Sequence, residues 1–135
     1  MDTLTPEQRS ACMSRVRSKD TKPEMIVRRL LHSRGYRYRL HDRRLPGNPD
    51  LTFVGRRKVI FIHGCFWHMH EGCIRASIPK SQTEFLQLKL ENNRTRDQMN
   101  IARLEKLGWS VHVVWECELR DIKVVIARLE QFLKN

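Results

Sequence analysis

The chain has 135 residues, and its hydrophobic content of 40% is sufficient for one core, so we expect a single domain over residues 1–135. Its sequence holds neither an apolar run long enough to cross a bilayer nor a signal-peptide pattern, which argues against a membrane protein and predicts a cytoplasmic one. Lys and Arg number 26 against 15 Asp and Glu, and the net charge of +11 predicts a polyanionic partner such as nucleic acid, with a basic surface kept for solubility as the alternative.

Two helix start signals lie near the beginning of the chain. The segment Thr5–Gln8 has the residues of a capping box, and we expect a short helix from there to about Arg17. A second capping box at Thr21–Glu24 predicts a helix that runs to Arg34 and stops at Gly35.

Three strands are predicted next. Residues 36–41 alternate between polar and apolar side chains, which is typical of a strand, and the two prolines in residues 44–49 predict a turn. Residues 50–54 and 58–64 predict two further strands. The short loop between them begins with Gly55, and this favours a β-hairpin.

The predicted hairpin creates a polar corner at one end of the sheet. Antiparallel pairing about Arg56 would place Asp50 opposite Ile62, with His63 one step beyond. A carboxylate at a strand end beside histidines suits Mg²⁺, which prefers one or two carboxylates together with water and phosphate oxygens. Asp is also common at the end of a turn, so a purely structural role for Asp50 is the alternative.

The second half of the chain predicts a long helix, a strand and a final helix. A third capping box at Ser81–Glu84 begins a helix that should end near Leu107, just before Gly108. Residues 109–115 predict a strand, and Asp121 is expected to cap the last helix. One face of that helix should be apolar and should carry Ile122, Val125, Leu129 and Phe132.

The long helix connects two apolar strands, residues 59–62 and 111–115, and such a crossover makes its two strands parallel neighbours. The predicted order is α-α-β-β-β-α-β-α. The expected fold class is therefore α/β, with a mixed sheet flanked by helices.

The segment His63–Cys73 is the densest in chemical groups, with three histidines, two cysteines and one glutamate. Phe66 and Trp67 are adjacent in its middle. On an extended backbone these two rings would point to opposite sides, so both could not turn into the core. Projection of the rings from a functional site and packing of both rings in the core are the two interpretations.

Several motifs in the chain resemble those of known nucleases. The dipeptide Pro49-Asp50, followed by a hairpin and a short motif, resembles the PD-(D/E)xK superfamily, although Phe61-Ile62-His63 stands where that superfamily has an acidic residue and a lysine. Together with "PGNPDLTF", "VIFIHGCFWHMHEGC", "TEF", Arg96-Asp97, "LGW" and "VWEC", the chain closely resembles the very-short-patch repair (Vsr) mismatch endonucleases. The resemblance extends from about Thr5 to the last helix.

This resemblance implies a restriction-endonuclease-like fold with a structural zinc site. It also implies Mg²⁺-dependent nicking of double-stranded DNA on the 5′ side of the thymine in a T·G mismatch, the lesion left when 5-methylcytosine deaminates. We expect a monomer, with mismatch-repair proteins as candidate partners. An endonuclease of the same fold without mismatch preference, and a zinc-stabilised DNA-binding module without catalysis, are the alternatives.

The resemblance also implies roles for the residues of the polar corner. Asp50 matches the Mg²⁺ ligand, together with the main-chain carbonyl of Ile62. His68 matches the general base that activates water, and His63 matches a histidine near the scissile phosphate. Glu24 matches an active-site acid, but it is also the third residue of a capping box, where glutamate bonds back to the N-cap amide without any catalytic role.

A zinc site is implied for three cysteines and one histidine. An even number of cysteines could form disulfides, but three of the four lie near other metal-ligating residues, which favours a metal. Cys65, His70, Cys73 and the distant Cys117 match the ligands of the family, a set that is typical of closed structural zinc. Reduced buried thiols are the alternative, and Cys12 falls outside the set.

Two residues of the long helix match positions that read the mismatched base pair. Lys89 and Asn93 are one helical turn apart, so they share a face. Lysine can donate to base carbonyls, and asparagine can both donate and accept. A solvated charged face is the alternative. Leu86 departs from the family pattern, which has tryptophan there, so the aromatic surface against DNA is smaller by one ring.

Three further residues match family positions that enter the DNA stack. Phe66 and Trp67 match rings that insert beside the mismatch, and Met13 matches a residue that inserts from the minor groove. The helical segment at residues 1–20 is therefore expected to contact DNA, although a core position is the usual role of a helical Met.

Overall fold

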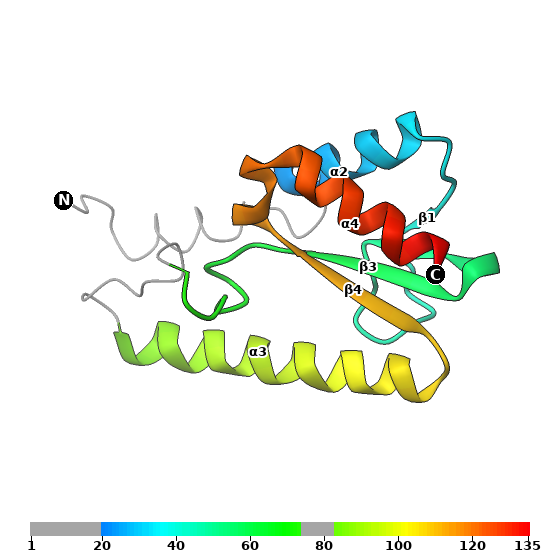
Figure 1. The fold of residues 1–135 in the computed structure, drawn as a ribbon. Coiled ribbons are helices and arrows are strands. Elements are labelled where there is room, and N and C mark those ends of the chain that lie inside the picture. The colour runs from blue at the N-terminus through cyan, green and yellow to red at the C-terminus, as the bar shows by residue number, and fades with distance from the viewer. Residues whose placement is uncertain (1–19, 74–82) are drawn as a thin grey trace.

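A computed structural model describes residues 20–73 and 83–135 of the chain (Figure 1). The predicted helix between Thr5 and Arg17, with Cys12 and Met13, lies outside these residues, as does the start of the third capping box. Within the described part of the chain, no helix is long and apolar enough to cross a membrane.

Four strands form one mixed sheet in the order β1-β2-β3-β4. They are β1 (Arg39–Leu40), β2 (Leu51–Phe53), β3 (Lys58–His63) and β4 (Ser110–Trp115). The hairpin pair β2–β3 is antiparallel and the crossover pair β3–β4 is parallel, which confirms both predictions. The first strand is shorter than predicted.

Strand β1 is short because the backbone departs from the extended conformation directly after it. Before it, the rings of Tyr36 and Tyr38 pack edge-on against Phe53, with centroids 6.4 and 5.8 Å away. After it, His41 adopts a left-handed conformation with φ 47°, which an extended strand does not allow.

The hairpin register differs from the prediction by one residue. Leu51 pairs with Ile60 and Phe53 with Lys58, so continuing this register places Asp50 opposite Phe61 rather than Ile62. The connection contains a 3-10 turn at Val54–Arg56 followed by Arg57 in the left-handed region. Because this turn has four residues, the centre of the hairpin lies between Gly55 and Arg56. The predicted pairing centred on Arg56 was therefore wrong.

Helix α2 (Lys22–Ser33) begins at the predicted capping residue and ends before the predicted glycine. The hydroxyl of Thr21 accepts a hydrogen bond from the amide of Glu24 at 3.4 Å. In return, the Glu24 carboxylate accepts from the amide of Asp20 at 3.2 Å, one residue before the expected donor. Gly35 has φ 86°, a conformation that a side chain would strain.

Helix α3 (Thr83–Lys106) and helix α4 (Ile122–Lys134) also match their predicted positions. Gly108 follows α3 with φ 93°. The Asp121 carboxylate caps α4 by accepting from the amide of Val124 at 3.3 Å. The predicted apolar face of α4 needs correction, because Ile122 is 42% exposed in the first turn. The buried residues of α4 are Val125, Ile126, Leu129 and Leu133, and Phe132 packs at their edge.

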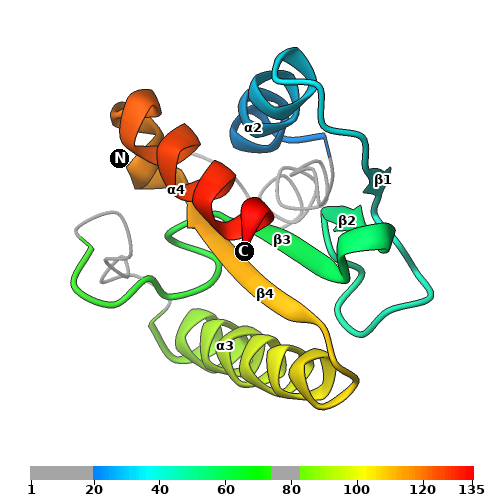
Figure 2. The same ribbon diagram turned by 45° about the vertical axis from the view of Figure 1, so that its right-hand side comes forward.

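Helices cover both faces of the sheet (Figure 1, Figure 2). Helices α2 and α4 lie on one face, where Leu31 and Leu129 are fully buried against Ile60. Helix α3 lies on the other face, where Leu104 packs with Val59. Adjacent residues of β3 thus face opposite helical layers of the fold.

Candidate active site and metal-binding residues

Asp50 immediately precedes β2 and reaches across to the end of β3. Its carboxylate accepts a hydrogen bond from the amide of Ile62 at 2.7 Å, so the two predicted residues meet despite the shifted register. Burial raises the pKa of Asp50 to about 7, with the Ile62 amide opposing the rise and the nearby Glu24 carboxylate adding to it. Burial thus disfavours the ionised Asp50 carboxylate, and a divalent cation bound beside it would offset that cost.

Glu24 is a buried carboxylate at the start of α2, with 1% of its surface exposed. Besides the Asp20 amide, its oxygens contact Arg28 at 3.2 Å and the Nε2 of His41 at 2.9 Å. The capping role anticipated from the sequence is thus present, but the same carboxylate also adjoins Asp50. His41 was missed because it lies far from Glu24 in the chain and on an irregular turn.

His63 and His68 form a stacked pair beside this corner. Their ring centroids are 3.9 Å apart and their planes differ by 3°. His63 is 5% exposed, and burial together with the neighbouring His68 lowers its pKa to about 4, so its ring is uncharged at neutral pH. The structure therefore brings together both histidines that the motif indicated.

Asp97 on α3 completes the pair, because the Nδ1 of His68 is hydrogen-bonded to the Asp97 carboxylate. A carboxylate can only accept here, so Nδ1 carries the proton and the Nε2 of a neutral His68 is left as an acceptor. The sequence offered one signal for this contact: Asp97 lies one helical turn after Asn93 on the same helix face. The sequence motif Arg96-Asp97 contains this residue but predicts no contact with His68.

A compact turn, not an extended segment, links His63 to the metal-ligating residues. The amide of His68 donates to the carbonyl of Gly64 at 3.2 Å, and the amide of His70 donates to that of Cys65 at 2.9 Å. The rings of Phe66 and Trp67 consequently contact each other edge-on, with centroids 5.1 Å apart and both half-buried. Opposite orientation of the two rings on an extended backbone was therefore wrong.

The four predicted zinc ligands converge on one point. One ligand atom from each of Cys65, His70, Cys73 and Cys117 lies within 4.8 Å of the others. Cys65 is fully buried, and burial raises the pKa of its thiol to about 12, a penalty that a bound cation would remove. All three cysteines are reduced and lie outside any disulfide. Three sulfurs and one imidazole at this separation fit a closed tetrahedral metal site.

Comparison with known proteins places these groups in a family. Residues 1–75 match the profile described as DNA mismatch endonuclease Vsr. The chain belongs to the Vsr family. It is 53% identical to "Type II nicking enzyme V.XorIIP" of Xanthomonas oryzae over 98% of this chain and 96% of that protein. It is 44% identical to "Type II nicking enzyme V.NmeAIP" of Neisseria meningitidis over 99% and 95% of the two chains.

A third relative is the "DNA mismatch endonuclease Vsr" of Escherichia coli, which is 44% identical over 83% of this chain and 71% of that protein. Membership of the Vsr family makes the chain a DNA endonuclease, a hydrolase whose substrate is DNA. The excess of positive charge in the sequence agrees with this substrate.

The Vsr residues expected to read bases contact Trp67 in this structure. The Nζ of Lys89 lies 5.6 Å from the centre of the Trp67 ring, and the Nδ2 of Asn93 donates to the Trp67 carbonyl at 3.2 Å. Lys89 and Asn93 therefore share a face of α3, as predicted. Met13, the fifth predicted DNA-contacting residue, lies outside the described residues.

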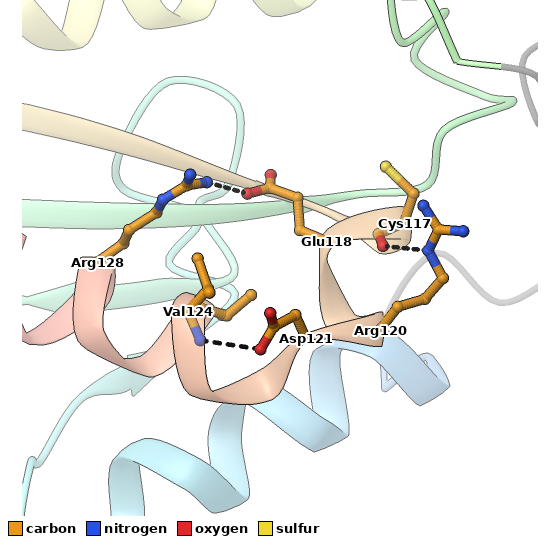
Figure 3. A pocket seen from close by; sticks show the side chains of 7 residues that line it. Cys117, Glu118, Arg120, Asp121, Val124 and Arg128 are labelled. Atoms are coloured by element: carbon orange, nitrogen blue, oxygen red, sulfur yellow. Dashed lines mark hydrogen bonds and ion pairs between the residues drawn. The ribbon is translucent and has the colours of Figure 1, made fainter.

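A surface pocket next to Cys117 is accounted for by local structure (Figure 3). It lies between α4 and the 3-10 helix at Glu116–Arg120, which follows β4. Arg120 donates to the Cys117 carbonyl at 3.3 Å, and Arg128 pairs with Glu118 at 3.2 Å. These contacts hold the segment that delivers Cys117 to the other three ligands.

Proposed function

We propose that this Vsr-family chain nicks double-stranded DNA on the 5′ side of the thymine of a T·G mismatch and so begins the repair of deaminated 5-methylcytosine. The observation that carries the proposal lies at the end of β3, where Asp50 accepts from the Ile62 amide and the next residue, His63, stacks on His68. The names of the relatives, one a mismatch endonuclease and two nicking enzymes, support it. The flanked mixed sheet is consistent with a PD-(D/E)xK-type fold.

In this proposal Asp50 and the main-chain carbonyl of Ile62 hold a catalytic Mg²⁺. The raised pKa of Asp50 supports a cation there, since the ionised carboxylate is poorly compensated without one. When bound, the ion would neutralise charge on the scissile phosphate and stabilise the leaving oxygen. Glu24 adds a second negative charge to the same corner and is held rigidly by Arg28 and His41.

His68 is the proposed general base. Its Nε2 accepts a proton from the attacking water while the water oxygen bonds to phosphorus and the bond to the leaving oxygen breaks. Asp97 keeps the imidazole in the required tautomer and stabilises the imidazolium that forms. His63 is uncharged at neutral pH and stacks on the face of the His68 ring. It can donate one N–H to the phosphate.

The set of Cys65, His70, Cys73 and Cys117 holds structural zinc in this proposal. His68 lies within the turn that Cys65 and His70 enclose, and short-range backbone hydrogen bonds shape that turn. A bound ion would fasten both ends of the turn and so fix the base.

Phe66 and Trp67 are the proposed wedge that tests the duplex. Stacking on a base contributes about 1–3 kcal/mol per ring. Opening a base step costs a few kcal/mol, and less where a mismatch already weakens stacking. Insertion is therefore favoured at T·G pairs. It requires Lys89 to leave the Trp67 ring, and the exposed cation–π contact that is lost contributes only about 0.5–1 kcal/mol.

Release from Trp67 would free Lys89, together with Asn93, to bond to the mismatched bases. Residues 1–20 form a DNA-contacting part of the same single domain, with Met13 inserting from the minor groove. The enzyme acts as a monomer, and mismatch-repair proteins are its proposed partners.

One nicking assay tests the proposal. The protein is incubated with Mg²⁺ and with otherwise identical duplexes that carry T·G or T·A, and the products are separated on denaturing gels. We expect one strand of the T·G duplex to be cut on the 5′ side of the thymine. Equal cutting of both duplexes would instead indicate a nuclease without mismatch preference, and no cutting would indicate a DNA-binding module.

A further inference from the structure

Trp115 lies between the metal-ligating residues and the histidine pair. It is the last residue of β4, where it pairs in parallel register with His63 at the end of β3. Its ring stacks face-to-face on His70, with centroids 4.1 Å apart and planes 7° from parallel. Its ring also meets His63 edge-on, at 5.2 Å and 73°.

These contacts form a continuous column of rings. His70 stacks on Trp115, Trp115 meets His63, and His63 stacks on His68, whose other partner is Asp97. The column thus runs from a proposed metal ligand to the proposed base, and each ring in it is flat and rigid. Because close-packed side chains transmit displacement instead of absorbing it, the position of His68 depends on every ring in the column.

The backbone of Trp115 is itself held in place. Its amide donates to the Glu118 carboxylate at 2.8 Å, and Glu118 is paired with Arg128 on α4. Trp115 is therefore anchored by β3 on one side and, through Glu118, by the Glu118–Arg128 pair seen in Figure 3 on the other. His63 is held by the same strand pair, whereas His68 lies on a turn and is held by the Gly64 carbonyl and by Asp97 of α3.

We propose that Trp115 is a positioning residue for strand nicking, which transmits the rigidity of the Cys-His centre to the rings of His63 and His68. The assignment of a catalytic role to those rings rests on the function proposed above, whereas the mechanical role of Trp115 does not. Trp115 acts through other residues and contacts neither DNA nor the reacting atoms.

The test compares Trp115→Met, which keeps most of the volume but removes the flat ring, with Trp115→Phe, which keeps an aromatic plane. In Trp115→Met we expect the single-turnover nicking rate at saturating enzyme to fall about 10–100-fold, as displacement of a catalytic group by about 1 Å does. The Kd for the T·G duplex, measured without Mg²⁺, should change less than about twofold on the same reasoning. Trp115→Phe should restore most of the rate.

Two measurements separate positioning from general destabilisation. Zinc content should remain equal to that of the parent in both variants. The imidazole proton signals of His63 and His68 in NMR spectra without DNA should shift and broaden in Trp115→Met, because the neighbouring ring current and wall are lost. Trp109→Leu is the control, since Trp109 directly precedes β4, far along the strand from Trp115, and packs with the α3 layer.

In Trp109→Leu we expect lower thermal stability with unchanged histidine signals and an unchanged saturating rate. A parental rate and parental histidine signals in Trp115→Met would overturn the proposal, as would loss of the fold in that variant, because Trp115 would then be a core residue. If the parent nicks no T·G duplex, the proposed function fails, and the histidine signals alone still decide whether Trp115 positions the rings.

Discussion

The active site depends on individual side chains whose chemistry is set by their surroundings. Burial raises the pKa of Asp50 and lowers the pKa of His63, so both side chains favour their uncharged forms. Both shifts have the same cause, because removal from water disfavours the charged form of each side chain. Burial of the ionised Asp50 carboxylate lowers the stability of the metal-free fold. A bound cation would offset this cost and would also attract the phosphate of DNA.

Asp50 should destabilise the metal-free fold as the pH rises. Its folded-state pKa of about 7 exceeds the ordinary value of 3.8, so its contribution is fully present below pH 3.8 and is lost as the pH rises through 7. Asp50→Asn should therefore match the parent at pH 4 and exceed its unfolding free energy by about 2–4 kcal/mol at pH 8. Chemical denaturation without Mg²⁺, and without a chelator that would remove zinc, measures this.

Mg²⁺ should reverse that difference at pH 8 by stabilising the parent but not Asp50→Asn. The variant should also lose nicking while retaining binding to the T·G duplex, because it removes the proposed metal ligand and no proposed DNA contact. Nicking by Asp50→Asn at the parental rate would exclude Asp50 as the metal ligand.

Asp97 should be needed for catalysis and dispensable for DNA binding. Asp97→Asn removes the charge that stabilises protonated His68, so we expect nicking to slow by about 10²–10⁴-fold. Single-turnover rates measure the loss, and gel shifts measure binding. Glu105→Gln, an exposed change on the same helix, serves as the control and should leave both values unchanged. Equal loss of rate in both variants would mean that the charge of α3 matters and the histidine contact does not.

At the level of elements, the site is built where the ends of β3 and β4 meet a turn without regular structure. Strand β3 delivers Ile62 and His63, and β4 delivers Trp115 and then Cys117 through the following 3-10 helix. The turn from Gly64 to Cys73 supplies the remaining groups. Short-range backbone hydrogen bonds shape this turn, and a metal bound at its two ends would fix it further.

Loss of Cys117 should release the metal and loosen this turn. Cys117→Ala should lose one zinc per chain and lower the unfolding free energy, because the free energy of metal binding adds to that of folding. Atomic absorption and thermal melts measure the two effects. Cys12→Ala, which alters a cysteine outside the set, should retain zinc. Absence of zinc from the purified parent would refute this expectation.

Removal of both rings of the turn should abolish discrimination without unfolding the protein. In the double variant Phe66→Ala and Trp67→Ala we expect zinc content and melting temperature near those of the parent, since both rings are half-exposed. Preference for T·G over T·A should fall by at least about tenfold, because stacking of about 1–3 kcal/mol per ring is lost. A variant that unfolds, or that discriminates as well as the parent, would show that the rings serve packing.

At the level of the whole molecule, the net charge of +11 distinguishes this chain from an average domain. Part of the charge is used internally, as in the contacts of Arg28 with Glu24 and of Arg44 with Asp42. The 26 basic residues outnumber the 15 acidic ones, and this excess is available to a polyanionic substrate. The net positive charge of the whole chain thus attracts a polyanion over a long range.

Affinity for DNA should fall steeply with added salt. Each phosphate contact contributes about −0.9 to the slope of log K against log salt, so a chain that makes 6–10 contacts should lose roughly 10³–10⁵ in affinity between 50 and 200 mM salt. Fluorescence anisotropy with a labelled T·G duplex measures the slope. A flat response would show that the basic residues do not contact phosphates.

Local features were determined by the sequence alone. The caps at Thr21 and Asp121 and the stops at Gly35 and Gly108 were predicted at their observed places. Each depends on residues within one turn of the chain, where hydrogen bonds and backbone angles decide the outcome. The β-hairpin and the parallel crossover were predicted for the same reason, since turn residues and helix length largely set them.

Only the tertiary structure decided which distant groups meet. The hairpin register, His41 against Glu24, Asp97 against His68 and the ring column through Trp115 join segments separated by many residues. The metal ligands were matched through a family pattern, yet their convergence depends on strands β3 and β4 running side by side. Such contacts follow from the packing of two helical layers on one sheet, and no local preference of the chain encodes the position of a layer.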